Sequence, residues 1–281
     1  MKLDPISKYA AAGTKLRLNR FSQNLRHAAE HPGDPKAIHD LRVAIRRTEQ
    51  ACKTFRELFD PASVKKLRWR LHRLMELCAA VRNCDVALIL LDQAGVTTGA
   101  SVSRLKKTRA AAAKKLSRRL AKERLKRPPE PAPRSHPKEG EWKLDQSLES
   151  NLCRLLPGLA DEWFAAGKAA IPAQASYQAL HRFRLQAKRF RYALELFEGF
   201  YGNEIARAAG VLKELQDRLG AINDCVATIT ILGRDRRAVA AVSRLLRQRK
   251  AALQTYARSQ FVPKKLDWWK RWLAQPAPRA A

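Results

Sequence analysis

The sequence is poor in several features that define common protein classes. Glycine is scarce, with 12 residues among 281, and the alternating apolar pattern of β-strands is short and rare. No run of 18 apolar residues occurs, so no membrane span is predicted. No apolar stretch of a signal peptide follows the first five residues, Met1 to Pro5. We therefore expect a cytoplasmic protein.

Cysteine pairs and catalytic motifs that would indicate an enzyme are also absent from the sequence. The five cysteines are irregularly spaced without a C-x-x-C pair, which predicts reduced thiols and neither a zinc nor a thioredoxin-like site. No G-x-S-x-G, Walker A, G-x-G-x-x-G or H-E-x-x-H motif occurs. His27, His31, His72 and His136 lack metal-ligand partners at a suitable spacing. The acidic residues are too scattered for a Mg²⁺ cluster. We predict no catalytic residues, no cofactor and no metal site.

Acidic residues are also few relative to basic ones. Lysine and arginine total 56 against 26 aspartates and glutamates, which gives a formal net charge of +30. Self-repulsion of this size destabilises a compact state unless bound anions relieve it. Hydrophobic residues make up 46% of the chain, enough for a packed core. The composition predicts a folded protein whose partner is a polyanion: inorganic polyphosphate, nucleic acid or an anionic membrane.

Apolar residues recur at spacings of three and four almost throughout, which predicts an all-α fold. Helices are expected at about 6–30, 35–59, 62–92, 101–127, 144–167, 176–201, 203–233 and 234–258, with a short last helix around the tryptophans of 268–272. The proline-rich stretch 128–140 is incompatible with a helix and is predicted to be a linker. We expect two four-helix bundles, 5–127 and 141–273, within a single domain that spans 5–273.

The two halves contain the same motif. Residues 39–47 and 181–189 both read H-x-Φ-R-Φ-x-x-[RK]-R, where Φ is apolar. The likeness extends further, because Phe55, Leu71, Leu74, Ala80 and Cys84 correspond to Phe197, Leu212, Leu215, Ala221 and Cys225. This internal duplication predicts that the two bundles are related by a pseudo-two-fold axis.

The repeated motif forms a narrow basic stripe beside an apolar helix face. At about 100° per residue, His39, Arg42, Arg46 and Glu49 fall within an arc of about 80°. In the second copy, Arg191 replaces the glutamate, so that stripe is fully cationic. Arginine forks, lysine and histidine suit phosphate oxygens. The predicted polyanion-binding residues are His39, Arg42, Arg46, Arg47, His181, Arg184, Lys188 and Arg191.

Other basic residues leave two interpretations open. Further candidates for the site are Arg20, Arg82, Arg189 and Lys213. Arg47 and Arg189 lie about 80° from the histidine of their motif, where they either widen the basic surface or are only solvated. Arg82 and Lys213 either close the site or form structural salt bridges, for example with Asp85 or Asp217.

Two segments outside the motif also have alternatives. The very basic stretch 101–127 either guides polyanions towards the site or is a solvated helix. In the last helix, three tryptophans alternate with lysine and arginine, which fits either packing on the bundle or a membrane interface.

The duplicated helix resembles the signature of the CHAD family, the conserved histidine α-helical domain. Further matching segments are Arg82-Asn83-Cys84-Asp85-Val86, Leu219-Gly220-Ala221-Ile222-Asn223-Asp224 and the run 188–195. The resemblance covers about 5–273, and Asn83 and Glu49 depart from the usual residues. It implies two helical bundles that bind inorganic polyphosphate in a basic central pocket, through His39, Arg42, Arg46, His181, Arg184, Lys188 and Arg191.

From the stripes and the resemblance we expect non-catalytic binding of polyphosphate in a groove lined by the two duplicated helices. Some members of the family associate with polyphosphate granules, which the resemblance extends to this chain. A nucleic-acid-binding module that uses the same basic surface is the alternative, although no aromatic residues alternate with the cations of the stripes.

Overall fold

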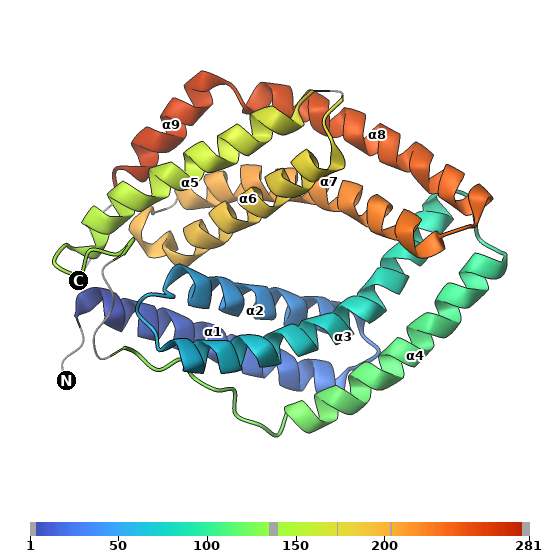
Figure 1. Ribbon diagram of the computed structural model, residues 1–281, viewed down its shortest axis with the longest axis horizontal. Helices are drawn as coiled ribbons and strands as arrows, with labels where there is room; N and C mark the ends of the chain where they lie inside the picture. Colours follow the sequence, from blue (N-terminus) through green and yellow to red (C-terminus); the bar gives the residue numbers. More distant parts are fainter. Residues whose placement is uncertain (1–3, 135–139, 173, 203, 277–281) are drawn as a thin grey trace. The chain divides into compact units, whose positions relative to one another are not determined.

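The computed structural model describes residues 4–134, 140–172, 174–202 and 204–276. Within these ranges the fold is all-α, as predicted, and the β-structure is limited to an isolated bridge between Phe59 and Pro133. The α-helices, drawn in Figure 1, are α1 (Pro5–Glu30), α2 (Pro35–Thr54), α3 (Pro61–Gln93), α4 (Ala100–Glu123), α5 (Leu148–Ala170), α6 (Tyr177–Leu196), α7 (Glu204–Leu232), α8 (Arg236–Gln260) and α9 (Pro263–Leu273). A short 3₁₀ turn, η1 (Glu198–Phe200), follows α6.

The first three helices begin at an Asp-Pro pair, where the aspartate caps free N–H groups and the proline takes the first helical position. Asp34 accepts hydrogen bonds from the backbone N–H groups of Lys36 and Ala37, at 2.8 and 3.2 Å. The predicted start of α2 is therefore confirmed. This cap sets the phase of the helix that carries the first basic stripe.

Several helix ends differ from the prediction because tertiary contacts decide them. The helix α2 ends at Thr54 rather than near Phe59, since Leu58 and Phe59 are buried in a turn instead of another helical turn. The helix α6 likewise ends at Leu196, before η1, and α5 begins at Leu148 and continues through Pro157 to Ala170.

The described structure divides into two compact units, residues 1–140 with 228–242 and residues 141–227 with 243–281. The division after residue 140 matches the end of the predicted linker, but the turn between α7 and α8 belongs to the first unit. Ser101 Oγ donates a hydrogen bond to Asp235 Oδ2 at 2.6 Å, and Arg104 donates to the carbonyl of Leu232 at 3.2 Å. In this division the second compact unit is formed by two separate stretches of the chain. The pseudo-two-fold relation stays a prediction.

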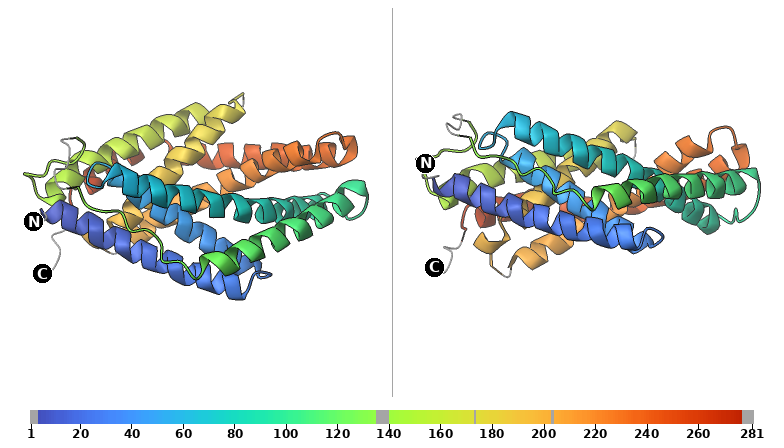
Figure 2. Two further views of the ribbon diagram at one scale, coloured as in Figure 1. Left: turned by 60° about the horizontal axis from the view of Figure 1, so that its bottom comes forward. Right: turned by 90° about the horizontal axis from the view of Figure 1, so that it is seen from below.

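In the first unit, α1 lies along α2, and α3 lies along α4 (Figures 1 and 2). The core between them contains Phe21, Leu41, Ile45 and Phe55, which are fully buried. The described part of the predicted linker is non-helical, as expected, and runs back along this unit. Its backbone is attached to the turn after α2, because Asp60 N–H donates to the Ala132 carbonyl at 2.8 Å.

In the second unit, aromatic rings make the core. Trp163 of α5 lies 5.2 Å from Phe190 of α6, 5.1 Å from Phe261 and 5.5 Å from Trp269 of α9, measured between ring centroids. Trp269 is only 3% exposed, so the last helix packs on its own unit, in line with the first of the two interpretations. Among the described helices, none combines the length and the hydropathy that crossing a bilayer requires.

All five cysteines lie in described segments, and each is a free thiol. Four of them are buried. Burial raises the pKa of the Cys52 thiol to about 12 and that of Cys78 to about 11. The four buried thiols are core residues without reactive character, because burial raises the pKa of each one.

Candidate polyanion-binding surfaces

The first basic stripe, His39, Arg42 and Arg46, lies beside the buried face of α2, as predicted. Leu41, Ile45 and Thr48 are buried, which fixes the orientation of the helix. His39 is exposed, and the two arginines of the stripe are half-buried. The stripe therefore combines positive charge with reduced access to water, an arrangement that strengthens contacts to anions.

Electrostatic coupling joins a neighbouring arginine to this stripe. The pKa of His39 is lowered, first by partial desolvation and then by the positive charges of Arg82, Arg42 and Arg46, while Asp40 opposes the shift. Arg82 is on α3 and half-buried. The structure thus brings this predicted residue close to the α2 stripe, within one unit. The carboxylate of Asp85, suggested as a partner for Arg82, instead pairs with Arg109 of α4, Nε to Oδ1, at 2.5 Å.

A glutamate ends the α2 stripe. Burial raises the pKa of Glu49, whereas Arg68, His72 and Arg46 act in the opposite direction. Glu49 also lines a cavity of about 600 Å³ between α2 and the start of α3, together with Arg56, Lys65, Arg68, Trp69 and His72. Glu49 therefore places a carboxylate among cations at the position where the second copy of the motif has Arg191.

Trp69 in this cavity is a feature that the sequence analysis missed. Its side chain is 58% exposed, and the Arg73 guanidinium lies over its ring at 5.0 Å from the centroid. The helical spacing of Arg68, Trp69 and Arg73 was visible in the sequence, but it lies outside the repeated motif. An exposed indole among cations is a surface on which an aromatic base can stack.

The second basic stripe, His181, Arg184, Lys188 and Arg191, lies on α6 beside buried Phe183, Ala187 and Phe190. His181 is exposed and the other three members are half-buried. Arg191 forms an ion pair with Glu195, one helical turn later, at 3.3 Å from Nη1 to Oε1. Its guanidinium also lies over the Tyr192 ring, 4.9 Å from the centroid. The positive charge that the sequence predicted for this stripe is therefore partly neutralised by Glu195.

The remaining predicted residues differ in their surroundings. Arg189 pairs with Glu162 of α5, so it contributes less charge to a widened basic surface than the motif indicated. Arg47 is half-buried beside the α2 stripe, whereas Arg20 and Lys213 are exposed on α1 and α7. Because α2 and α6 belong to different units, a groove lined by both helices also stays a prediction.

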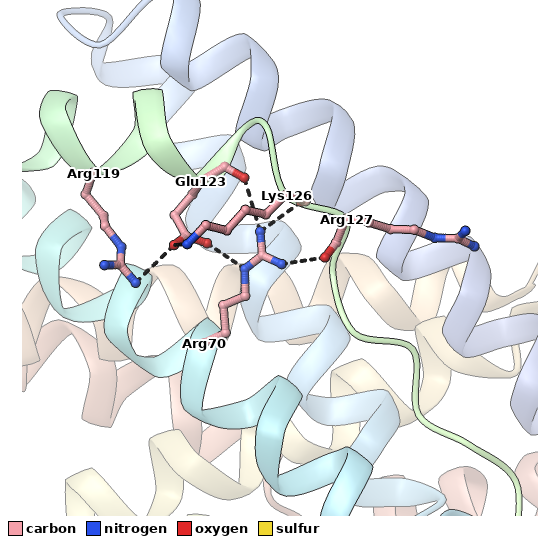
Figure 3. Close-up of polar contacts among 5 residues, drawn as sticks. All are labelled: Arg70, Arg119, Glu123, Lys126 and Arg127. Carbon is pink, nitrogen blue, oxygen red and sulfur yellow. Dashed lines mark hydrogen bonds and ion pairs between the residues drawn. The ribbon is translucent and has the colours of Figure 1, made fainter.

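The basic stretch of α4 contains a buried ion pair that the sequence pattern did not reveal (Figure 3). Arg70 of α3 donates from Nε to Glu123 at 2.6 Å, and these residues are 8% and 1% exposed. Arg70 also donates to the carbonyls of Lys126 and Arg127, at 3.0 and 2.8 Å. These bonds stabilise the chain as it leaves α4 at Glu123, several residues before the predicted end of the helix.

One cluster contradicts the expectation that no histidine has a metal-ligand partner. His27, Glu30 and His31, at the end of α1, each offer a ligand atom within 4.8 Å of the others. The spacing of three and four residues places them on one helix face. The signal in the sequence is the spacing of three and four residues, which brings His27, Glu30 and His31 together only when the segment is helical.

Comparison with known proteins agrees with the fold and the motif. The model of the CHAD domain family matches residues 15–233, well over half of the chain. No curated protein matches. The crystal structure of the CHAD domain from the plant Ricinus communis is 24% identical, covers 98% of this chain and 96% of its own, and superposes with a TM-score of 0.56. PptA from Streptomyces chartreusis is 18% identical, with 93% and 99% covered and a TM-score of 0.56.

Proposed function

The chain belongs to the CHAD domain family, and from this premise we propose that it binds inorganic polyphosphate without catalysing its breakdown. The observation that carries the proposal is the recurrence of one stripe of His, Arg and Lys beside the buried face of both α2 and α6. The proposed contacts are His39, Arg42, Arg46 and Arg47 on α2, and His181, Arg184, Lys188 and Arg191 on α6, with Arg82 beside the first stripe.

Polyphosphate suits these stripes chemically. Each internal phosphate carries about one negative charge, and one helical turn advances about 5.4 Å. Cations one turn apart therefore reach successive parts of an extended phosphate chain. Arginine binds phosphate oxygens through two parallel hydrogen bonds, and lysine adds a mobile charge. Because binding releases condensed counterions, we expect the affinity to fall steeply as salt is added.

A non-catalytic role is favoured by the surroundings of the carboxylates. Phosphoryl transfer generally requires carboxylates that hold Mg²⁺ against the phosphate oxygens. Asp85 pairs with Arg109, and burial raises the pKa of Glu49. Within the described ranges, three metal-ligating side chains come together at His27, Glu30 and His31. This cluster contains a single carboxylate, whereas Mg²⁺ sites for phosphoryl transfer use several oxygen ligands.

The test is a calorimetric titration of the purified chain with long-chain polyphosphate at several salt concentrations. We expect saturable binding and, with Mg²⁺ or Mn²⁺ present, no release of phosphate and no shortening of the chains. Absence of binding at low salt would refute the proposal. Release of phosphate would show that the protein is an enzyme.

A nucleic-acid-binding function is the second candidate, and Trp69 favours it. This exposed indole lies among Arg68, Arg73 and Lys65, where a base would stack while its phosphates contact the cations. Competition separates the two functions. In this assay, single-stranded RNA competes with labelled polyphosphate at the same concentration of phosphate units and at physiological salt. If the chain is a polyphosphate-binding protein, the RNA should fail to displace the polyphosphate. Ready displacement by RNA would favour the second candidate.

We further propose that the protein associates with polyphosphate granules in the cytoplasm. A fluorescent fusion should colocalise with stained granules, and it should become diffuse in cells that lack polyphosphate. Uniform fluorescence in granule-containing cells would contradict this part of the proposal and leave binding itself untouched.

A further inference from the structure

The last turn of α1 brings together three side chains that commonly bind metal ions. His27, Glu30 and His31 are all exposed, and one ligand atom from each lies within 4.8 Å of the others. The two imidazole rings have centroids 4.8 Å apart and are tilted by 55°. Residues separated by three and four positions occupy one helix face, so the backbone holds the donors near one another.

We propose that this turn is a binding site for a divalent transition-metal ion of the zinc, nickel and copper class. One nitrogen from each histidine and one oxygen of Glu30 would be the ligands. Imidazole with a carboxylate suits these metals, whereas Mg²⁺ and Ca²⁺ require mostly oxygen ligands. This proposal is independent of the polyphosphate function.

The geometry needs only side-chain adjustment. A zinc–nitrogen bond of about 2.0–2.1 Å places two ligands of a tetrahedral ion about 3.3 Å apart. Exposed side chains can shorten their present separations by rotating between staggered conformers. Three protein ligands leave one position of a tetrahedral ion for water or an anion.

The local electrostatics favour a cation here despite the net charge of +30. The carbonyl end of a helix carries partial negative charge, and His31 is the C-cap of α1. The backbone N–H of Asp34 donates to the His31 carbonyl at 3.1 Å, so Asp34, whose carboxylate caps α2, adjoins the cluster.

The site is not a by-product of the internal duplication. The duplication aligns His39 with His181, and the same shift aligns His27, Glu30 and His31 with Ala169, Pro172 and Ala173. None of these three residues offers a metal-ligating side chain. The cluster is therefore specific to the first half of the chain.

The test is a Zn²⁺ titration of the full chain, prepared without a polyhistidine tag, in competition with a chromogenic chelator. We expect one equivalent of bound Zn²⁺, and His27→Ala or His31→Ala should each weaken binding by about tenfold or more, as loss of a ligand does. Circular dichroism checks that both variants remain folded, which is expected because both side chains are exposed.

Two controls make the result specific. His72 faces Glu76 one turn away at 3.3 Å but has no second histidine beside it in that turn, so His72→Ala should leave Zn²⁺ binding unchanged. Cys153 is less buried than the other cysteines, and Cys153→Ser should also retain the binding. The proposal is overturned if the chain binds no Zn²⁺ at about 100 µM, a concentration that reveals even weak sites, or if the His27 and His31 variants bind as the natural chain does.

Discussion

At the scale of single residues, the charge that each stripe offers an anion depends on what its cations already contact. Burial and three neighbouring arginines lower the pKa of His39, so its imidazole is mainly neutral at pH 7 in the folded chain without ligand. Glu195 partly neutralises Arg191. Each copy of the motif therefore offers an anion less positive charge than its sequence indicates.

The lowered pKa of His39 predicts proton uptake when a polyanion binds. Bound phosphate favours the imidazolium and raises the pKa again, so affinity should increase as pH falls from about 8 towards 6.5. Calorimetry in two buffers of different ionisation enthalpy measures the protons taken up, and His39→Gln should reduce that number. The same uptake in His39→Gln would show that His39 does not contact the ligand.

The lowered pKa of His39 also determines how folding stability depends on pH. Below pH 6.5 the unfolded chain protonates His39 more readily than the folded chain does, so the contribution of this residue to stability decreases as pH falls.

Removing the carboxylate beside Arg191 should strengthen binding. Glu195→Gln leaves the Arg191 guanidinium without its ion-pair partner, so we expect polyphosphate affinity to rise by up to about fivefold, equivalent to about 1 kcal/mol for a partly exposed charge pair. Glu76→Gln on α3, which pairs with His72, is the control for a change of net charge alone. Equal gains in both variants would show that only the net charge matters.

At the scale of elements, a buried ion pair stabilises the end of α4. Glu123→Gln should lower the free energy of unfolding by about 2–3 kcal/mol, because it leaves the buried Arg70 charge without its carboxylate. Urea unfolding measures the loss. Glu130 pairs with Arg127 at the surface, so Glu130→Gln should cost less than about 1 kcal/mol. A neutral Glu123→Gln would contradict the role assigned to the pair.

Two glycines of α5 provide a second test of packing. A Cβ at Gly167 would meet the Phe261 ring at 2.4 Å, so Gly167→Ala should destabilise the fold by about 1–3 kcal/mol. A Cβ at Gly158 meets nothing within 4 Å, and Gly158→Ala should instead stabilise the helix by about 0.5–1 kcal/mol. Urea unfolding of both variants checks these signs, and matching signs would contradict the described packing of α5 against Phe261.

Local signals predicted the elements well where short-range chemistry decides them. The Asp34-Pro35 start and the buried face of α2 follow from capping and from helical periodicity. The end of α4 did not follow, because Arg70, more than fifty residues earlier in the sequence, binds the carbonyls there. The Arg191–Glu195 pair was readable from a spacing of four residues, whereas the pairing of Arg189 with Glu162 requires the packing of α5 on α6.

At the scale of the whole molecule, the duplication and the net charge of +30 together led to the proposed function. The division at the α7–α8 turn was not predictable, because contacts such as Ser101 with Asp235 join residues far apart in the sequence. Many cations of α4 are exposed and lie outside both stripes. The central question is whether polyphosphate responds to charge in general or to the stripes in particular.

The most direct test compares two double variants that remove the same charge. Arg184→Ala with Lys188→Ala changes the α6 stripe, and Lys106→Ala with Lys107→Ala changes the exposed face of α4. With long-chain polyphosphate at physiological salt, we predict that the first variant loses affinity by about tenfold or more and the second by less than about twofold. Equal losses would contradict binding at the stripes and leave only a diffuse effect of charge.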